Sequence, residues 1–159
     1  MVSNMKSSVM IVTLILTGIF LFMKDKHEQD RNVRNNNPLN IREDDLVDYD
    51  WVGEHERDLD SEFEEFESVE YGFRAAYKVL LTYRNKRKLD TIAGIIGRWA
   101  PPSENDTQGY IDYVAKRLNF SPYETLSLER YPELINAMAD KEGKNNWNIE
   151  HVKQGIALA

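Results

Sequence analysis

The side chains in this sequence that could carry out chemistry are carboxylates, amides and aromatic rings. There is no cysteine and there are three widely spaced histidines, so the sequence offers no thiolate site and no recognisable zinc-ligand spacing. It also lacks the motifs of nucleotide-binding loops, zinc proteases and serine hydrolases. Carboxylates combined with amides and aromatic rings suit the cleavage of glycosidic bonds, in which a protonated acid donates to the leaving oxygen. We therefore expect no metal and no cofactor.

The first candidate acid is Glu142, which stands just before Gly143 at the predicted end of a helix. The negative end of the helix dipole disfavours a second negative charge. A carboxyl group placed there, in a partly apolar cleft, would have a raised pKa and would stay protonated as a general acid. The alternative is an exposed glutamate beside a fraying helix end, without a catalytic role.

A second candidate acid is Glu104, in the stretch Pro-Pro-Ser-Glu-Asn-Asp-Thr. It is predicted to act as a catalytic acid or to line the cleft, and the alternative is a part in capping the helix that follows. Between Glu43 and Glu70, fourteen acidic residues stand against a single arginine. This run either forms a solvated surface or supplies a second carboxylate that holds water. The candidates for that carboxylate are Asp44, Asp45 and Asp58, and Glu28 is a weaker candidate acid upstream.

Amide, hydroxyl and aromatic side chains are predicted to hold the substrate. The predicted substrate-binding residues are Asn36, Asn37, Asn40, Trp99, Asn105, Thr107 and Tyr110. The asparagine amides would bind N-acetyl groups, although turn formation beside Pro38 explains them at least as well. The rings would stack on sugars, and their alternative is core packing, because both lie on apolar helix faces.

The spacing of apolar residues predicts a mainly helical domain. Helices are expected at residues 69–85, 91–99, 105–118, 131–142 and 149–156. Ser68 is the expected N-cap of the first helix, and Pro101 and Gly143 follow the ends of two others. Short strands are expected at residues 39–42 and 63–66. The predicted fold class is therefore α+β, with the strands confined to one small lobe.

The N-terminal segment predicts a membrane anchor. Residues 7–23 carry no charge, and their length falls within the roughly 17–25 residues that a membrane-spanning helix needs. A cleaved signal peptide is the alternative, but no small-residue cleavage site ends the run. We predict an anchor and tether over residues 1–33 and one domain over residues 34–159. The basic residues after the span favour a cytoplasmic domain, whereas a substrate on the other side of the membrane would require the opposite orientation, and the sequence leaves this conflict open.

The charge of the chain bears on its partners. The formal net charge is −7. Phosphate neutralisation needs clustered lysine and arginine, so nucleic acid is not an expected partner.

Four stretches resemble a family of small phage and prophage proteins, often described as virion structural proteins or lysozyme-like proteins. They are Arg34–Arg42 (RNNNPLNIR), Trp51–Gly53 (WVG), Phe63–Ala75 (FEEFESVEYGFRA) and Arg98–Ile111 (RWAPPSENDTQGYI). The resemblance covers residues 34–159. The Asn-Asn-Pro-Leu-Asn-Ile stretch is also similar to the Asn-Asn-Leu-Phe-Gly-Ile stretch of flagellar-type glucosaminidases, which belong to the lysozyme-like superfamily.

The resemblance implies a circularly permuted lysozyme-like domain. In that superfamily the catalytic glutamate ends a helix, usually as Glu-Ser-Gly, ahead of the strand-rich lobe, but no such stretch precedes Asn36. The stretch from Leu134 to Gly143 is similar to this signature at the opposite end of the chain. It implies a catalytic role for Glu142, although Gly143 follows directly where one further residue is expected.

Together, the residues and the resemblance predict a membrane-anchored muramidase or lytic transglycosylase that cleaves the glycan strands of peptidoglycan. The expected location is the inner membrane with the domain in the periplasm, or the virion membrane, and virion components are possible partners. The alternatives are a non-enzymatic virion or membrane structural protein that keeps a glycan-binding lysozyme-like domain, and a cytoplasmic-facing inhibitor. In an enzyme, Glu142 should share a cleft with Asn36, Asn40, Glu104 and Tyr110, whereas in a structural protein it should point into solvent.

Overall fold

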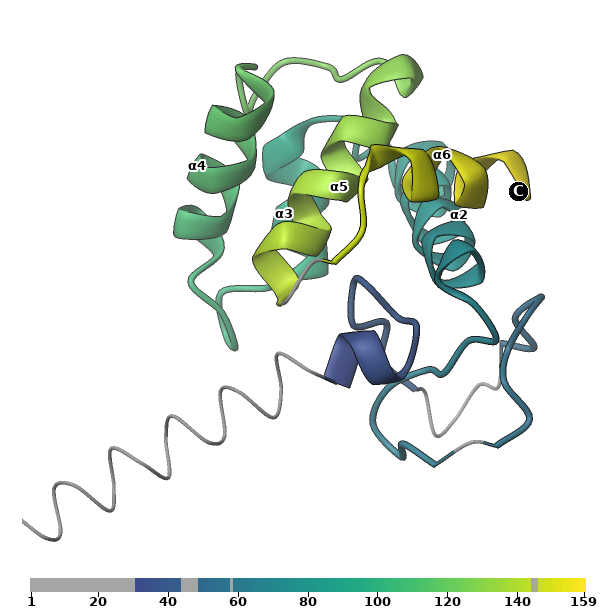
Figure 1. The fold of residues 1–159 in the computed structure, drawn as a ribbon. Helices are drawn as coiled ribbons and strands as arrows, with labels where there is room; N and C mark the ends of the chain where they lie inside the picture. The colour runs from purple at the N-terminus through teal and green to yellow at the C-terminus, as the bar shows by residue number, and fades with distance from the viewer. Residues whose placement is uncertain (1–30, 44–48, 58, 144–145) are drawn as a thin grey trace, which may run out of the picture.

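The computed structural model describes residues 31–43, 49–57, 59–143 and 146–159 (Figure 1). Within this part of the chain, none of the helices has the length and apolar character that crossing a bilayer requires. The predicted anchor at residues 7–23 lies outside the described residues and stays a prediction. The same holds for four of the carboxylates considered above, namely Glu28, Asp44, Asp45 and Asp58.

Helices make up most of the described structure, as the sequence predicted. They are α2 (Val69–Arg87), α3 (Ile92–Trp99), α4 (Thr107–Leu118), α5 (Tyr131–Glu142) and α6 (Ile149–Ala157), with a short 3-10 helix, η1 (Leu128–Arg130), before α5. All five predicted helices are confirmed, and their ends differ by no more than about two residues from those expected. Helix α5 ends at Glu142, so the first candidate acid does occupy a helix C-terminus.

Side-chain caps fix where α3 and α4 begin. The Thr91 hydroxyl accepts a hydrogen bond from the Gly94 backbone N–H at 3.0 Å, and Asp106 accepts one from Gly109 N–H at 3.0 Å. Such caps satisfy backbone donors that have no partner within the helix. Ser68 occupies the N-cap position of α2, but its side chain makes no capping bond, so the predicted mechanism of capping is wrong there.

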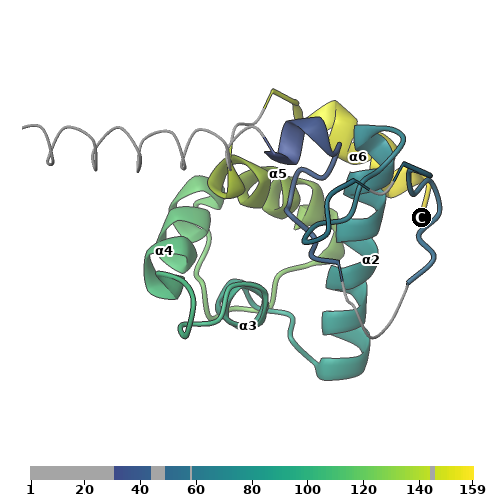
Figure 2. The same cartoon turned by 90° about the horizontal axis from the view of Figure 1, so that it is seen from below.

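The helices pack around one apolar core. Helices α3 and α5 lie between α4 on one side and α2 with α6 on the other (Figures 1 and 2). The largest fully buried helical side chains are Phe73, Leu80, Ile92, Ile95, Ile96, Tyr131, Leu134, Ile135 and Met138. They come from α2, α3 and α5, which shows that the apolar faces read from the sequence meet in the interior.

The N-terminal lobe, which comprises the described residues from 31 to 68, begins with helical residues 31–34 and is irregular after them (Figure 1). The two strands predicted there are wrong: among the described residues the lobe shows only the isolated antiparallel bridges Arg42–Phe63 and Glu54–Phe66. Asn36 and Asn40 both adopt left-handed backbone conformations with φ of 50°, which asparagine tolerates better than most residues. Two such positions within five residues interrupt an extended strand. The described fold is therefore mainly helical, and the strand part of the α+β prediction is corrected.

A close backbone contact joins the lobe to α2. A Cβ atom at Gly72 would lie 2.1 Å from the Asn36 carbonyl oxygen and 2.8 Å from Pro38 Cδ. Only glycine permits this approach, so the Asn-Asn-Pro turn is seated directly on the first turn of α2.

Candidate functional site

A cleft of about 570 Å³ lies between the N-terminal lobe and the helices. The lobe contributes Arg31, Asn40, Arg42 and Phe63 to its lining, among others. The opposite side is formed by α2, by α3 with the loop that follows it, and by the end of α5, including Trp99, Glu104, Asn105 and Glu142. The cleft therefore joins residues that are up to 111 positions apart in the sequence.

Glu142 is held in a fixed orientation at this cleft. Its Oε1 accepts a hydrogen bond from the Tyr110 hydroxyl at 2.8 Å and one from the Trp99 indole N–H at 3.0 Å. The side chain borders the cleft, yet its surroundings withdraw the carboxyl group from water. Burial raises the pKa of Glu142 above its ordinary value, and the donors from Tyr110 and Trp99 oppose that rise without cancelling it. The carboxyl group thus combines a preference for the proton with donors that stabilise the anion.

Tyr110 and Trp99 are part of the site in a role that the sequence did not predict. Both were expected to stack on sugars or to pack in the core. Tyr110 is buried in α4, and its hydroxyl oxygen also lies 3.3 Å from the Met138 carbonyl oxygen, which competes with Glu142 for the one phenol proton. Burial, followed by the nearby Glu142 carboxyl, raises the pKa of Tyr110 well above its ordinary value, so the phenol remains a donor. Trp99 lines the cleft and packs edge-on against Tyr83, with ring centres 6.5 Å apart.

Asn40 connects the lobe to the end of α5. Its Nδ2 donates to the backbone carbonyl of Glu142 at 3.2 Å. The last carbonyls of a helix lack partners within the helix, so this bond both closes α5 and places the lobe turn at the cleft. Of the three asparagines in the Asn-Asn-Pro-Leu-Asn stretch that were predicted to bind substrate, Asn40 is the one that lines the cleft.

Asn36 and Asn37 serve the turn. The Asn36 amide donates to the Phe66 carbonyl at 3.0 Å. Asn37 is buried, donates to the carbonyls of Ile41 and Glu64 at 2.9 Å each, and accepts from the Ile41 N–H at 2.9 Å. Neither residue lines the cleft. For these two side chains the structure supports the turn-forming alternative.

The loop after α3 forms one rim of the cleft. Glu104 is exposed there, and its Oε2 lies 3.4 Å from Nη2 of Arg42 in the lobe. Asn105 also lines the cleft and donates to the Pro101 carbonyl at 3.4 Å. The Thr107 hydroxyl donates to the Ala100 carbonyl at 2.6 Å, which ties the loop to the end of α3.

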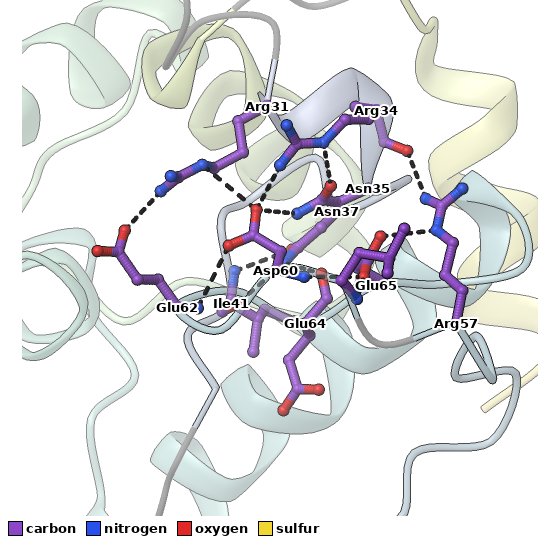
Figure 3. Close-up of polar contacts among 11 residues, drawn as sticks. Arg31, Arg34, Asn35, Asn37, Ile41, Arg57, Asp60, Glu62, Glu64 and Glu65 are labelled. Carbon is purple, nitrogen blue, oxygen red and sulfur yellow. Dashed lines mark hydrogen bonds and ion pairs between the residues drawn. The ribbon is translucent and has the colours of Figure 1, made fainter.

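A buried polar network supports the lobe wall of the cleft (Figure 3). Asp60 accepts hydrogen bonds from Arg34 at 2.6 Å and from Asn35 at 2.8 Å, and its carboxylate lies 3.3 Å from Arg31 Nε. Burial alone would raise the pKa of Asp60, but the hydrogen bonds and the two arginines outweigh burial and lower it. Asp60 therefore stays ionised and holds Arg31, which lines the cleft, in place.

Arg31, Arg42 and Phe63 are among the side chains of the cleft that the sequence did not single out. The guanidinium carbons of the two arginines lie 5.0 Å and 5.9 Å from the centre of the Phe63 ring. Cation–π contacts of this kind favour arginine over an aromatic face. The only available signal was the position of Arg42 inside the Asn-Pro-Leu-Asn-Ile-Arg stretch. As to metals, no group of three or more suitable His, Asp or Glu side chains occurs among the residues that the structure describes.

Comparison with known proteins identifies the origin of the chain. No protein-family model matches the sequence. It is 42% identical over 152 residues to Protein P5 of Pseudoalteromonas phage PM2, and the match covers 95% of both proteins. The chain belongs to the Protein P5 family. The P5 match confirms the predicted phage origin, but it gives no support to membership of a lysozyme-like family. The name P5 states no activity, so the chemistry of the cleft has to be argued from the residues themselves.

Proposed function

We propose that this P5 relative cleaves the glycan strands of peptidoglycan, with Glu142 as the general acid. The observation that carries the proposal is the environment of this carboxyl group. It ends helix α5, it borders a cleft, burial raises its pKa, and two donors fix its orientation. An exposed glutamate at a fraying helix end would have none of these contacts. The arrangement is the one expected of a carboxyl group that must hold a proton near neutral pH and then release it.

The proposed reaction uses both oxygens of Glu142. Because Tyr110 and Trp99 both donate to Oε1, Oε2 is the oxygen that carries the transferable proton. The proton passes from Oε2 to the glycosidic oxygen, the bond between that oxygen and the anomeric carbon breaks, and positive charge develops on the sugar ring. Water or a hydroxyl group of the sugar itself then attacks the anomeric carbon and gives its proton to the Glu142 carboxylate, which restores the acid.

The two donors act mainly after proton transfer begins. A hydrogen bond to a charged acceptor is worth about 1.5–3 kcal/mol, which exceeds the value of a bond to a neutral one. Tyr110 and Trp99 therefore stabilise the developing carboxylate more than the neutral acid. This difference between the two protonation states is what lowers a barrier. Burial favours the protonated acid beforehand by raising its pKa, and the donors make its ionisation accessible.

Other cleft residues have proposed roles in holding the glycan. Asn40 and Asn105 line the cleft, and the parts of their amides that are not used in the bonds to Glu142 and Pro101 would meet N-acetyl groups. Trp99 also lines the cleft, where its ring would contact a sugar. Glu104 remains the second candidate carboxylate, on the opposite rim from Arg42. In the same proposal, residues 7–23 anchor the domain in the inner membrane, facing the periplasm, or in the membrane of the virion, where other virion components are partners.

A second candidate function is structural. The P5 match gives a phage protein without a stated activity, and a virion protein needs surfaces for assembly. Tyr49, Val52 and Leu59 in the N-terminal lobe are large apolar residues that are more than half exposed. Exposed apolar residues favour contact with another protein when they gather in a patch. In this case the cleft would bind glycan without cleaving it.

Digestion of purified peptidoglycan separates the two candidates. The full-length wild type in mild detergent is compared with Glu142→Gln, which removes the transferable proton, and with Glu133→Gln, an exposed glutamate on the same helix that does not line the cleft. We expect a fall in turbidity and soluble fragments from the wild type and Glu133→Gln, and a loss of at least about a hundredfold for Glu142→Gln. Equal cleavage by all three would move the acid to Glu104. No cleavage by any folded variant would favour the structural function.

A further inference from the structure

The cleft contains two arginines that differ in their solvent exposure and in their ion pairs. Arg31 is 20% exposed, and it pairs with Asp60 at 3.3 Å and with Glu62 at 2.6 Å. Arg42 is 72% exposed, and its one ion pair with the residues that the structure describes joins Nη2 to Glu104 at 3.4 Å. Arg31 is thus part of the wall, whereas Arg42 stands at the cleft with most of its surface in water.

Within the described part of the chain, the pair between Arg42 and Glu104 occupies only a small part of the guanidinium group. An arginine presents five N–H donors in a planar fork that matches the two oxygens of a carboxylate. The contact to Glu104 uses one nitrogen at the long end of hydrogen-bond distance, and Glu104 is itself 58% exposed. Exposed pairs of this kind are worth little, about 0–1 kcal/mol. A better-placed carboxylate would therefore displace Glu104 at small cost.

The position of Arg42 matters because the chain as a whole is acidic. With a net charge of −7, the protein gives no general attraction to an anionic ligand. Yet Arg42 lines the same cleft as Glu142, and it lies against the Phe63 ring, which restricts the directions that its guanidinium group can take. The only cation in the described cleft lining besides Arg42 is Arg31, which its two acidic partners already neutralise.

We infer that Arg42 binds a carboxylate of the substrate, so that the cleft selects carboxylate-bearing glycans over neutral ones. This inference rests on the proposed function, because it names the class of glycan that the same cleft takes. Peptidoglycan fits the class, since its peptide stems carry free carboxylates, whereas chitin is an N-acetylated glycan without them. Glu104 holds the guanidinium group in the unliganded protein and yields it to the carboxylate of the ligand.

Binding measurements test this inference without requiring turnover. Full-length Glu142→Gln protein is titrated calorimetrically with soluble peptidoglycan fragments that carry peptide stems, and with chitohexaose. Adding Arg42→Gln should weaken binding of the peptidoglycan fragments about tenfold and leave chitohexaose binding within about twofold. Arg42→Lys, which keeps the charge but loses the fork, should lie between. Glu104→Gln should strengthen binding of the peptidoglycan fragments, because it removes the competing carboxylate.

The control is Arg87→Gln, which removes an exposed arginine that does not line the cleft. Arg87→Gln should change the affinity for neither glycan. If it weakened binding of the peptidoglycan fragments as much as Arg42→Gln does, the loss would come from net charge alone, and the inference would be overturned. An equal loss of both ligands in Arg42→Gln, or no loss of either, would overturn it as well. If the protein bound neither glycan before the arginine was changed, the proposed function itself would fail, and this result is distinct from the others.

Discussion

Replacing Glu64 with glutamine should make the protein more stable at pH 8 and leave its stability at low pH unchanged. Glu64 is 3% exposed in the N-terminal lobe and accepts a hydrogen bond from the Trp51 indole N–H at 2.9 Å. Burial raises the pKa of Glu64 to about 7, the Trp51 bond opposes the rise, and the carboxylates of Glu43 and Glu54 add to it. Glutamine keeps the shape and can still accept from Trp51, but it carries no charge at any pH.

The sign and size follow from proton linkage. With an ordinary pKa of 4.5 in the unfolded chain and about 7 in the folded one, the folded state holds its proton over a range in which the unfolded state releases it. Stability therefore falls as pH rises from 4.5 to 7, and the whole penalty is present above 7. At about 1.4 kcal/mol for each pH unit, the penalty is about 3 kcal/mol. Asp60 and Glu65 have lowered pKa values, so they make stability fall as the pH drops into the acidic range. Both residues are present in the wild type and in Glu64→Gln, so their effect cancels in the difference.

The assay is urea unfolding of full-length protein, followed by tryptophan fluorescence between pH 4.5 and 8. The quantity of interest is the difference in the free energy of unfolding between Glu64→Gln and the wild type, which should grow from near zero to about 3 kcal/mol in favour of the variant. Glu67→Gln, an exposed carboxylate in the same segment, should show less than about 0.5 kcal/mol at every pH. A difference that does not change with pH, or that grows toward acid, would refute this reasoning.

Three further predictions concern the site and its supports. Tyr110→Phe removes one donor to Glu142, and that donor lowers the pKa of the acid. The alkaline limb of the pH–activity profile should therefore move to higher pH, and the maximal rate should fall about tenfold. An unchanged profile would exclude the contact. Gly72→Ala should lower the free energy of unfolding by at least about 2 kcal/mol in chemical denaturation, because the new Cβ would lie 2.1 Å from the Asn36 carbonyl oxygen; a neutral substitution would contradict the seating of the turn. Asp106→Ala removes the cap of α4 and should cost about 1 kcal/mol in the same measurement, with Asp106→Asn restoring most of it.

The helices could be predicted because their signals are local. The apolar residues of α2, α4 and α5 recur at helical spacing, and caps or glycine mark several of the ends. Local signals of this kind do not depend on contacts with distant parts of the chain. The capping bonds were harder to predict: Ser68, the expected N-cap of α2, makes no side-chain bond, whereas Thr91 and Asp106 cap α3 and α4.

The lobe was harder to predict because tertiary contacts decide its conformation. Short apolar stretches around Ile41 and Phe63 looked like strands, but the chain there is held by the amide of Asn37 and by the left-handed turn at Asn40. When a side-chain amide takes the hydrogen bonds that a neighbouring strand would otherwise make, the sequence shows no periodic pattern that reveals it. The buried Asp60 network has the same character, since its partners come from residues 25 to 29 positions away.

The candidate site was predicted in part. Glu142, Glu104, Asn40 and Asn105 were named from the sequence, and they line one cleft. Tyr110 was also named, but the structure gives its hydroxyl a bond to Glu142 instead of a free face for a sugar. Helical spacing could place that side chain on an apolar face, but it could not show which atom of a distant helix its hydroxyl would reach.

Two ion pairs of the cleft could not be predicted either, because their partners are far apart in the sequence. They are Arg42 with Glu104 and Arg31 with Glu62. These pairs join positions 62 and 31 residues apart, and a single sequence holds no signal for contacts at such separations. From the sequence, Arg31 was one of the basic residues after the predicted span and Arg42 was the last residue of the Arg34–Arg42 stretch, and neither was placed in a cleft.

The most direct test of the central claim is the digestion of peptidoglycan in ¹⁸O-labelled water, with mass spectrometry of the fragments from the wild type and from Glu142→Gln. The proposed chemistry predicts new sugar ends from the wild type alone, either reducing ends that carry one labelled oxygen or anhydro ends that carry none. Both products report a broken glycosidic bond and also distinguish attack by water from attack by the sugar. Label at peptide carboxyl groups, or identical sugar ends from Glu142→Gln, would contradict the account.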